Sequence, residues 1–245
     1  MIKPPLYGDV VSEFYDLLYP PTDVPHVVEY VQSRYPDGSR IVDFGVGTGR
    51  TAIPLALAGH HVLGIDISER MIEALRDKDP EHTVATEVSD FTCATGDGSY
   101  DVCMILNNTF FMILGNEQRV RTLEAARSFL KPGGRLLLET YAAHHYLRAE
   151  SPVLNITPLG AGDLVLFDKI DVDPIKQQLL ALRSIVGRGN VATFVEVSRF
   201  ALPQELDLLA QTAGFDLAAR TSNWTGANVD AAAVSHISEY LRGSD

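Results

Sequence analysis

Hydrophobic and polar positions follow two alternating patterns over residues 40–141. Short apolar runs between polar turns predict buried strands, and apolar positions three or four residues apart predict helices. The predicted strands are RIVDFG, HVLGID, TVATEV, YDVCMIL and RLLLETY, which begin at residues 40, 61, 83, 100 and 135. The predicted helices are residues 50–59, ERMIEALRDK after a Ser68 N-cap, and residues 116–130. Such alternation predicts an α/β fold with a mostly parallel, doubly wound sheet, whose parallel strands end at one edge.

The segments on either side of this unit have different patterns. Helical spacing predicts one helix over residues 7–19 and, after the breaker PPTD, a second over 24–35. Residues 152–200 contain DLVLFDKIDVD, QLLALRSIVG and ATFVEVSRFAL, separated by turn residues, which predicts a small antiparallel insertion of about three strands. A helix over 203–215 and two closing strands, DLAARTSNW and VSHISEYLR, bring the main sheet to seven strands.

Composition narrows the classes of ligand. The 245 residues carry a net charge of −12, with a pI of about 4.9. Such an acidic chain lacks the basic surface that binds nucleic acid or an anionic membrane, so we expect a small-molecule substrate and neither of those partners. We also expect a cytoplasmic protein, because the N-terminus has no signal-peptide core and no run approaches about 18 apolar residues. Cys93 and Cys103 have no metal-ligand spacing, and no metal is expected.

The stretch IVDFGVGTGR follows the first predicted strand and contains three glycines at alternate positions. Glycines let a backbone approach a ligand closely, and the next helix offers free N–H groups there. The spacing is a poor match to the dinucleotide loop G-x-G-x-x-G, because Arg50 stands where the third glycine would be. The loop also lacks the G-K-[ST] of a P-loop. An ordinary glycine-rich turn is the alternative interpretation.

This loop resembles motif I, D/E-x-G-x-G-x-G, of the class I S-adenosylmethionine (SAM) methyltransferases, here Asp43 to Gly49. The segment LKPGGRLLLE before the fifth strand is also typical of these enzymes. The resemblance covers about residues 1–141. It implies SAM as cofactor, S-adenosyl-L-homocysteine (SAH) as product, and cofactor contacts from these loop and strand-end residues: Gly45, Val46, Gly47, Gly49, Asp66 and Ile67.

Acidic residues end the next two predicted strands. Asp66 lies 21 residues after Gly45 (66 − 45), where one carboxylate can accept from both ribose hydroxyls. NAD enzymes use the same device, and a helix-entry cap is the alternative. The resemblance further implies that Asp90 accepts from the adenine amino group and that Phe91 flanks the ring; a plain Asx-turn is the other interpretation of Asp90.

Two amides and two tyrosines complete the expected cofactor site. A strand that ends in Asn107-Asn108 is unusual, since buried amides need partners. The resemblance places Asn107 near the methionine part of SAM and Asn108 facing the substrate. It also likens YGDVVSEFYDLLY to a lid helix, in which Tyr7 and Tyr15, eight residues apart, donate to the cofactor; packing or exposure of either tyrosine is an even alternative.

The domain boundaries follow from these assignments. The resemblance implies an N-terminal helical lid over 1–38 and a SAM-binding α/β domain over 39–245. The insertion over 152–200 resembles that of sugar N-methyltransferases. We expect it to serve the substrate or dimerisation, because extra edge strands can pair with a second copy in a homodimer.

Catalytic residues carry a weaker signal than cofactor residues. Methyl transfer is an in-line displacement that expels a neutral thioether, so a base is needed only for a hydroxyl or a protonated amine. His144 and His145 are candidate bases, with exposed loop histidines as the alternative, and Tyr141 is a candidate to orient the acceptor. Trp224, beside Asn223, is a candidate pocket wall, although core packing is as good an interpretation.

The segment TFFMI, with Phe111 and Met112, predicts an apolar pocket floor and a hydrophobic or aromatic acceptor. Sugar N-methyltransferases carry polar or His side chains in that place, so this segment departs from their pattern.

The leading hypothesis is therefore a SAM-dependent methyltransferase that acts on an O or N of a small metabolite, such as a secondary-metabolite intermediate. The first alternative is a protein of the same fold that binds SAM but catalyses a cyclisation or only binds a ligand. The second alternative is an NAD-dependent oxidoreductase. The sequence leaves open the choice among O-, N- and C-methylation, as well as the oligomeric state.

Overall fold

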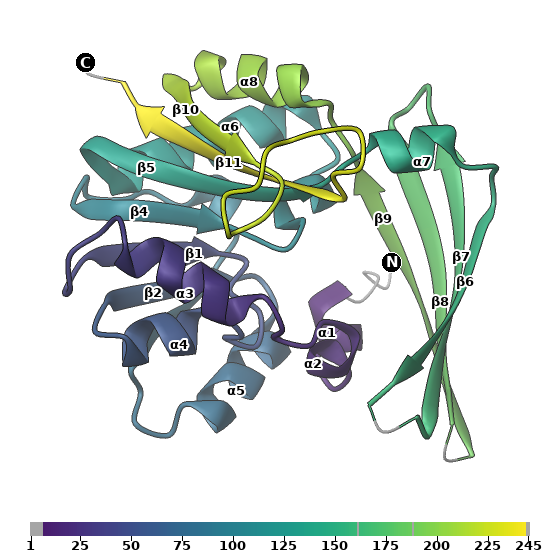
Figure 1. The fold of residues 1–245 in the computed structure, drawn as a ribbon. Coiled ribbons are helices and arrows are strands. Elements are labelled where there is room, and N and C mark those ends of the chain that lie inside the picture. Colours follow the sequence, from purple (N-terminus) through teal and green to yellow (C-terminus); the bar gives the residue numbers. More distant parts are fainter. Residues whose placement is uncertain (1–6, 161, 188, 244–245) are drawn as a thin grey trace.

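The computed structural model describes residues 7–160, 162–187 and 189–243, which form two sheets with helices around the first (Figure 1). The first sheet has seven strands in the order β10-β11-β5-β4-β1-β2-β3. Its strands in chain order are β1 Arg40–Phe44, β2 His61–Asp66, β3 Val84–Val88, β4 Tyr100–Ile105, β5 Leu130–Tyr141, β10 Phe215–Thr221 and β11 Ser235–Arg242. β1 to β5 pair in parallel, and β11 and β10 add antiparallel neighbours, so the predicted class I architecture is confirmed.

Helices cover both faces of this sheet because β1 is buried on both sides. Ile41 packs with the helices of one face, and Val42 and Phe44 pack with those of the other. The first group is α3 Val24–Gln32, α4 Ala52–Leu57 and α5 Glu69–Lys78; the second is α6 Asn116–Phe129 and α8 Pro203–Thr212. Ser68 Oγ accepts from the Met71 N–H at 3.2 Å, so the predicted N-cap of α5 is confirmed.

The second sheet is the predicted insertion, but it has four antiparallel strands in the order β6-β7-β8-β9 where about three were expected. The strands are β6 Val153–Leu159, β7 Leu164–Asp173, β8 Gln178–Gly187 and β9 Asn190–Arg199. β6 escaped prediction because most of its residues are exposed and it shows no alternation of buried and exposed positions. It is an edge strand, paired only with β7, and it accommodates Pro158 for that reason.

The N-terminal segment contains two short helices where one was predicted: α1 Tyr7–Val11 and α2 Tyr15–Leu18. Both lie between the carboxyl edge of the seven-stranded sheet and the four-stranded sheet (Figure 1). Val11 packs in a hydrophobic cluster with Met71 of α5 and with Phe194 of β9. We call α1, α2 and the residues up to Tyr19 the lid.

Three more short helices connect strands: η1 Phe91–Cys93, η2 Thr109–Met112 and α7 His144–Arg148. In the described part of the chain, no helix combines the length and apolar character needed to cross a bilayer.

Candidate functional site

The glycine loop turns sharply at the end of β1. Gly45, Gly47 and Gly49 have φ of +80°, +56° and +76°, a region that L side chains rarely adopt. A Cβ at Gly45 would lie 2.5 Å from Thr109 Cγ2, and one at Gly49 would lie 2.7 Å from Leu75 Cγ. Glycine is therefore required at positions 45 and 49 for two reasons, the φ and the space around it.

Asp66 closes this loop from the neighbouring strand. Its Oδ2 accepts from the Gly47 N–H at 2.9 Å, and its Oδ1 accepts from the Ser68 N–H at 2.9 Å. Burial raises the pKa of the Asp66 carboxyl, and these N–H groups oppose the rise by stabilising the anion. Asp43, behind the loop, is also buried, and burial together with the neighbouring Asp66 charge raises its pKa to about 7.

Arg50 explains the departure from the dinucleotide pattern. Its Nη1 lies 2.5 Å from Asp23 Oδ1 in an ion pair whose Arg50 side chain is 9% exposed and whose Asp23 side chain is 36% exposed. The residue at the third-glycine position thus fastens the loop to the segment that leads into α3. A glycine at that position could not make this contact.

A cavity of about 330 Å³ lies where the loop, the lid and the four-stranded sheet meet. The size is within the range of small-molecule sites. The described residues that line it come from the two sheet edges, the lid, α5 and η2: Tyr7, Gly8, Tyr15, Tyr19, Gly45, Gly47, Asp66, Ile67, Ser68, Met71, Phe91, Asn107, Asn108, Thr109, Met112, Ile113 and Glu196.

Asn107 and Asn108 form a strained corner at the end of β4, with φ of +49° and +66°. Glu139 of β5 holds this corner, since its Oε2 accepts from the Asn107 N–H at 3.0 Å. Asn107 Nδ2 donates to the Tyr15 hydroxyl at 2.7 Å, and Asn108 Oδ1 accepts from the Tyr141 N–H at 2.5 Å. The first amide therefore faces the lid, and the second is fixed to β5.

The lid is tied down on both sides of the cavity. Ser68 Oγ donates to Asp9 Oδ1 at 2.6 Å, and Thr48 Oγ1 donates to Asp16 Oδ1 at 2.7 Å. On the other side, Arg183 Nη1 of β8 donates to the Tyr19 hydroxyl at 2.7 Å. Burial raises the pKa of the Tyr15 and Tyr19 hydroxyls, so both keep their protons at neutral pH.

Comparison with known proteins identifies a methyltransferase domain and the class I methyltransferase fold. Residues 41–134 match the family described as "Methyltransferase domain". The CcbJ methyltransferase from Streptomyces caelestis superposes with a TM-score of 0.89 at 29% identity, covering 97% of this chain and 98% of that one. This chain therefore carries a methyltransferase domain and has the fold of the class I SAM-dependent methyltransferases. SAM is its cofactor.

Two further relatives extend this picture. The cypemycin N-terminal methyltransferase of a Streptomyces species is 29% identical to this methyltransferase over 229 residues, which are 92% of this chain and 93% of that protein. CalS10 of Micromonospora echinaspora, an amino pentose methyltransferase solved with SAM bound, has a TM-score of 0.72 at 17% identity. It covers 98% of this chain and 99% of that one, and at this identity it shows likeness of fold alone.

Most of the residues predicted to bind the cofactor line the cavity of this methyltransferase. Three of them, Val46, Gly49 and Asp90, do not. Val46 is buried against Gly64, and Gly49 packs between α4 and α5. Asp90 is exposed, and its Oδ1 accepts from the Thr92 N–H at 2.9 Å, which is the Asx-turn alternative, while Phe91 stacks on Phe44 with ring centroids 5.3 Å apart.

The three predicted catalytic residues do not line the cavity. His144 Nε2 lies 3.0 Å from the Ala231 carbonyl, and His145 Nε2 lies 2.8 Å from the Ala233 carbonyl. Both histidines face the loop before β11, because α7 turns the chain away from the sheet edge. The Tyr141 hydroxyl lies 3.0 Å from Ser198 Oγ, so this residue contacts the four-stranded sheet. Their catalytic role stays a prediction.

Of the four residues predicted to contact substrate, two line the cavity and two do not. Asn108 and Met112 line the cavity, whereas Phe111 is fully buried and does not line it. Trp224 is buried, donates from Nε1 to Glu139 Oε1 at 3.1 Å and packs on Tyr30, as its core-packing alternative predicts.

Four polar residues of the cavity were not among the predicted site residues: Tyr19, Ser68, Thr109 and Glu196. Tyr19 follows Tyr15 by four residues in the lid segment, so helical spacing was an available signal. Glu196 of β9 had none, since it reaches the cavity only through the pairing of the insertion. Within the described ranges, no group of three or more His, Cys, Asp or Glu residues is placed to hold a metal ion.

Proposed function

We propose that this methyltransferase moves the methyl group of SAM to an oxygen or nitrogen of a small metabolite held in the cavity. The observation that carries the proposal is the shape of the site: one cavity joins the glycine-loop edge of the first sheet to the lid and the second sheet. The name of one relative supports it, because that protein is a cypemycin N-terminal methyltransferase.

The residues present fit SAM at the loop edge. The bare backbone at Gly45 and Gly47 leaves room that side chains would fill, and Asp66 offers its carboxylate to the ribose hydroxyls. The Phe91 ring and the Ile67 side chain supply apolar surface for the adenine. Of the cavity-lining residues, we assign Tyr7, Tyr15 and Asn107 to the methionine part of SAM, and Asn108 and Met112 to the acceptor.

SAM supplies an electrophilic methyl group on a sulfonium, and the protein supplies position. Holding the donor and the acceptor aligned can lower the barrier by roughly 7–11 kcal/mol. Tyr7, Tyr15 and Tyr19 of the lid line part of the cavity and limit the access of water there, which favours transfer to the bound acceptor over loss to solvent.

Transfer of label tests this function against the non-methylating alternative. We expect methyl-labelled SAM, incubated with the protein and a fractionated small-molecule extract of the source organism, to label a discrete small-molecule fraction. The Asp66→Ala variant is the control and should transfer none. Label that stays on SAM in every fraction, although SAH binds, would favour the cyclisation or binding-only alternative.

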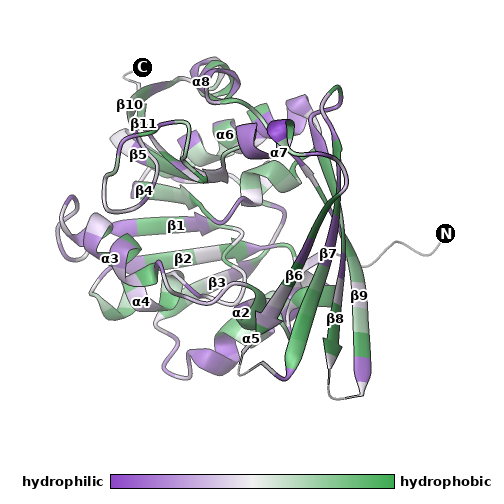
Figure 2. Cartoon of the chain, turned by 45° about the vertical axis from the view of Figure 1, so that its right-hand side comes forward, coloured by the Kyte–Doolittle hydropathy of each residue, from purple (hydrophilic) through white to green (hydrophobic). Residues whose placement is uncertain are grey.

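We also propose a homodimer, and we place it on the outer face of the second sheet instead of on a strand edge. Register puts a set of large apolar side chains on this face, each 43–70% exposed: Leu154, Ile156, Phe167, Leu180, Leu182, Val191 and Val195. Figure 2 turns this sheet toward the viewer and shows hydrophobic stretches along its strands.

A second copy is the partner that this face fits. The outer face of these four strands, which have up to 10 residues each, has a flat area of roughly 600 Å². Protruding side chains add to this area, which is close to the ~800 Å² that each partner buries in a stable complex. Lys169 and Asp171 pair on the same face at 2.6 Å, so the face is neutral there and does not repel its own copy.

A charge on this face should break the dimer. We expect the wild type to run at twice its 26.8 kDa in light scattering, and Leu182→Glu to run as a folded monomer, because two buried carboxylates would face an apolar partner. Leu208→Glu on α8 adds the same charge at a residue that is 64% exposed and should stay dimeric. A monomeric wild type would contradict the proposal.

A further inference from the structure

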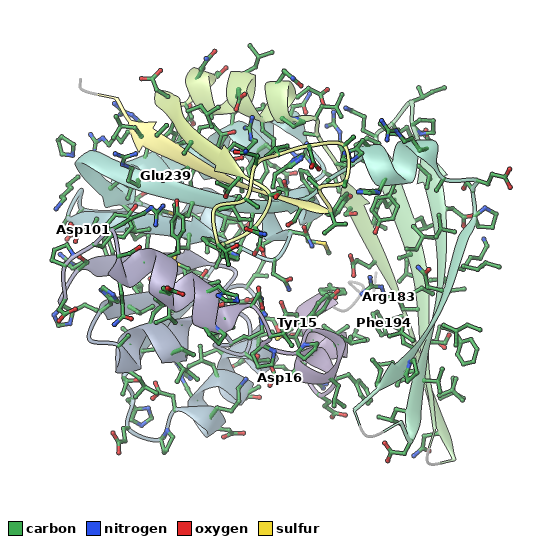
Figure 3. All side chains as sticks on the ribbon, in the orientation of Figure 1. Tyr15, Asp16, Asp101, Arg183, Phe194 and Glu239 are labelled. Carbon is green, nitrogen blue, oxygen red and sulfur yellow. The ribbon has the colours of Figure 1, made fainter. Side chains whose placement is uncertain are left out.

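Three charged side chains lie together on the inner face of the second sheet. Arg183 Nε of β8 lies 3.4 Å from Asp168 Oδ1 of β7, and Arg183 Nη1 lies 3.3 Å from Glu196 Oε2 of β9. The side chains of Asp168, Arg183 and Glu196 are only 10%, 15% and 17% exposed. Figure 3 shows Arg183 on the side of the sheet that faces Tyr15 of the lid. We call these three residues the charged cluster.

The charged cluster carries one negative charge in excess, from two carboxylates and one guanidinium. The groups that face it from the lid and from α7 are the hydroxyls of Tyr7, Tyr19 and Tyr146, and burial raises the pKa of each. These hydroxyls are therefore neutral and do not cancel the excess. Buried charge is costly unless a counter-charge reaches it, so the cluster favours a cationic ligand group.

Glu196 presents its negative charge to the cavity, because Glu196 is the residue of the charged cluster that lines the cavity. Asp66 lines the cavity at the glycine loop. Among the described lining residues there is no Lys, Arg or His side chain. With Asp66 facing the cofactor, Glu196 is the carboxylate left for the acceptor.

We infer that Glu196 selects an amine acceptor that enters as its ammonium form, an inference that rests on the proposed function. The apolar lining from Met112 and Ile113 then receives the carbon skeleton beside the amine. Arg183 is a positioning residue, since it holds Glu196 by one oxygen and the Tyr19 hydroxyl of the lid at the same time.

The Glu196 carboxylate also accepts the proton that an ammonium acceptor must lose before its nitrogen can be methylated. An ammonium nitrogen has no free lone pair, so one N–H proton passes to Glu196 before transfer. The nitrogen lone pair then forms the C–N bond while the C–S bond breaks, and its electron pair stays on sulfur as neutral SAH. The methylated nitrogen keeps one positive charge, and Glu196 releases its proton to water when the product leaves.

A pair of probes that differ only in charge tests this selection. We expect benzylammonium to bind the wild-type protein in complex with SAH at least tenfold more tightly than benzyl alcohol at pH 7, measured by calorimetry. Glu196→Gln keeps the size of the side chain and should reduce that preference to about one.

Two further variants separate charge from packing. Asp168 belongs to the charged cluster but is not among the described residues that line the cavity. Asp168→Asn should therefore reduce the preference for benzylammonium about threefold without changing the binding of benzyl alcohol. Asp171→Asn makes the same change on the outer face of the sheet and should leave the preference intact. Equal binding of the two probes to wild type, no binding of benzylammonium, or an unchanged preference in Glu196→Gln would each overturn the inference.

SAH binding is measured first for every variant, and it distinguishes the two proposals. If SAH does not bind the wild type, the proposed function fails and the selection fails with it. If SAH binds but the probes are not discriminated, the selection of an amine alone fails, and transfer to an oxygen is favoured.

Discussion

Asp66→Ala is expected to weaken SAM and SAH binding by at least about a hundredfold. The substitution removes a charged acceptor for two ribose hydroxyls, and hydrogen bonds to charged groups contribute about 1.5–3 kcal/mol each. Each 1.4 kcal/mol is about a tenfold change in affinity, so two such bonds account for this factor. The N–H groups of Gly47 and Ser68 lose their partner as well, which loosens the loop around the cavity.

Calorimetry with SAM and SAH measures this loss, and Asp77→Ala is its matched control. Asp77 is an exposed residue of α5, so the control removes the same charge without touching the cavity and should bind both compounds normally. Asp66→Asn keeps the shape but lacks the charge, and it should bind more weakly than wild type and more tightly than Asp66→Ala. SAM affinity within threefold of wild type in Asp66→Ala would contradict the ribose assignment.

Gly49→Ala should destabilise the fold through both its backbone and its packing. A Cβ at this position costs about 1–2 kcal/mol through its φ of +76°. It would also lie 2.7 Å from Leu75 Cγ and 2.9 Å from Ile53 Cδ1, and overpacking of this kind costs roughly 1–3 kcal/mol. The sum, about 2–5 kcal/mol, should lower the melting temperature by roughly 4–20 °C in a chain of this size.

Gly38→Ala isolates the backbone part of that effect. Gly38 has a φ of +80°, and a Cβ built there meets nothing within 4 Å. Its thermal unfolding should therefore show only the smaller loss of about 1–2 kcal/mol. If both variants melt at the same temperature, the close approach of the added Cβ at position 49 to Leu75 and Ile53 does not destabilise the fold.

The parts of the molecule that sequence predicts well are those with local causes. The spacing from Gly45 to Asp66 reflects one strand–helix–strand unit, and the Ser68 cap follows from a hydrogen bond to a residue three positions along the chain. Both could be predicted because the residues that interact are near one another in the chain.

The acceptor side of the cavity has no such local cause. Glu196 is brought to the lid by the register of β9 on β8, which no spacing in the sequence specifies. His144 and His145 come soon after β5, which ends at Tyr141, so the sequence suggests a place at the sheet edge. The hydrogen bonds to the Ala231 and Ala233 carbonyls hold them elsewhere. Long-range pairing decided both outcomes.

The contacts of the lid have a consequence for how this enzyme can change. If cofactor and acceptor are both enclosed, the lid must open once per turnover, and such motions often limit the rate. On the surface of α5, Lys78 Nζ forms an ion pair with Asp16 Oδ2 of the lid at 2.8 Å. Substitutions at such outlying residues can retune product release while the chemistry stays untouched, so selection for speed need not act on the cavity.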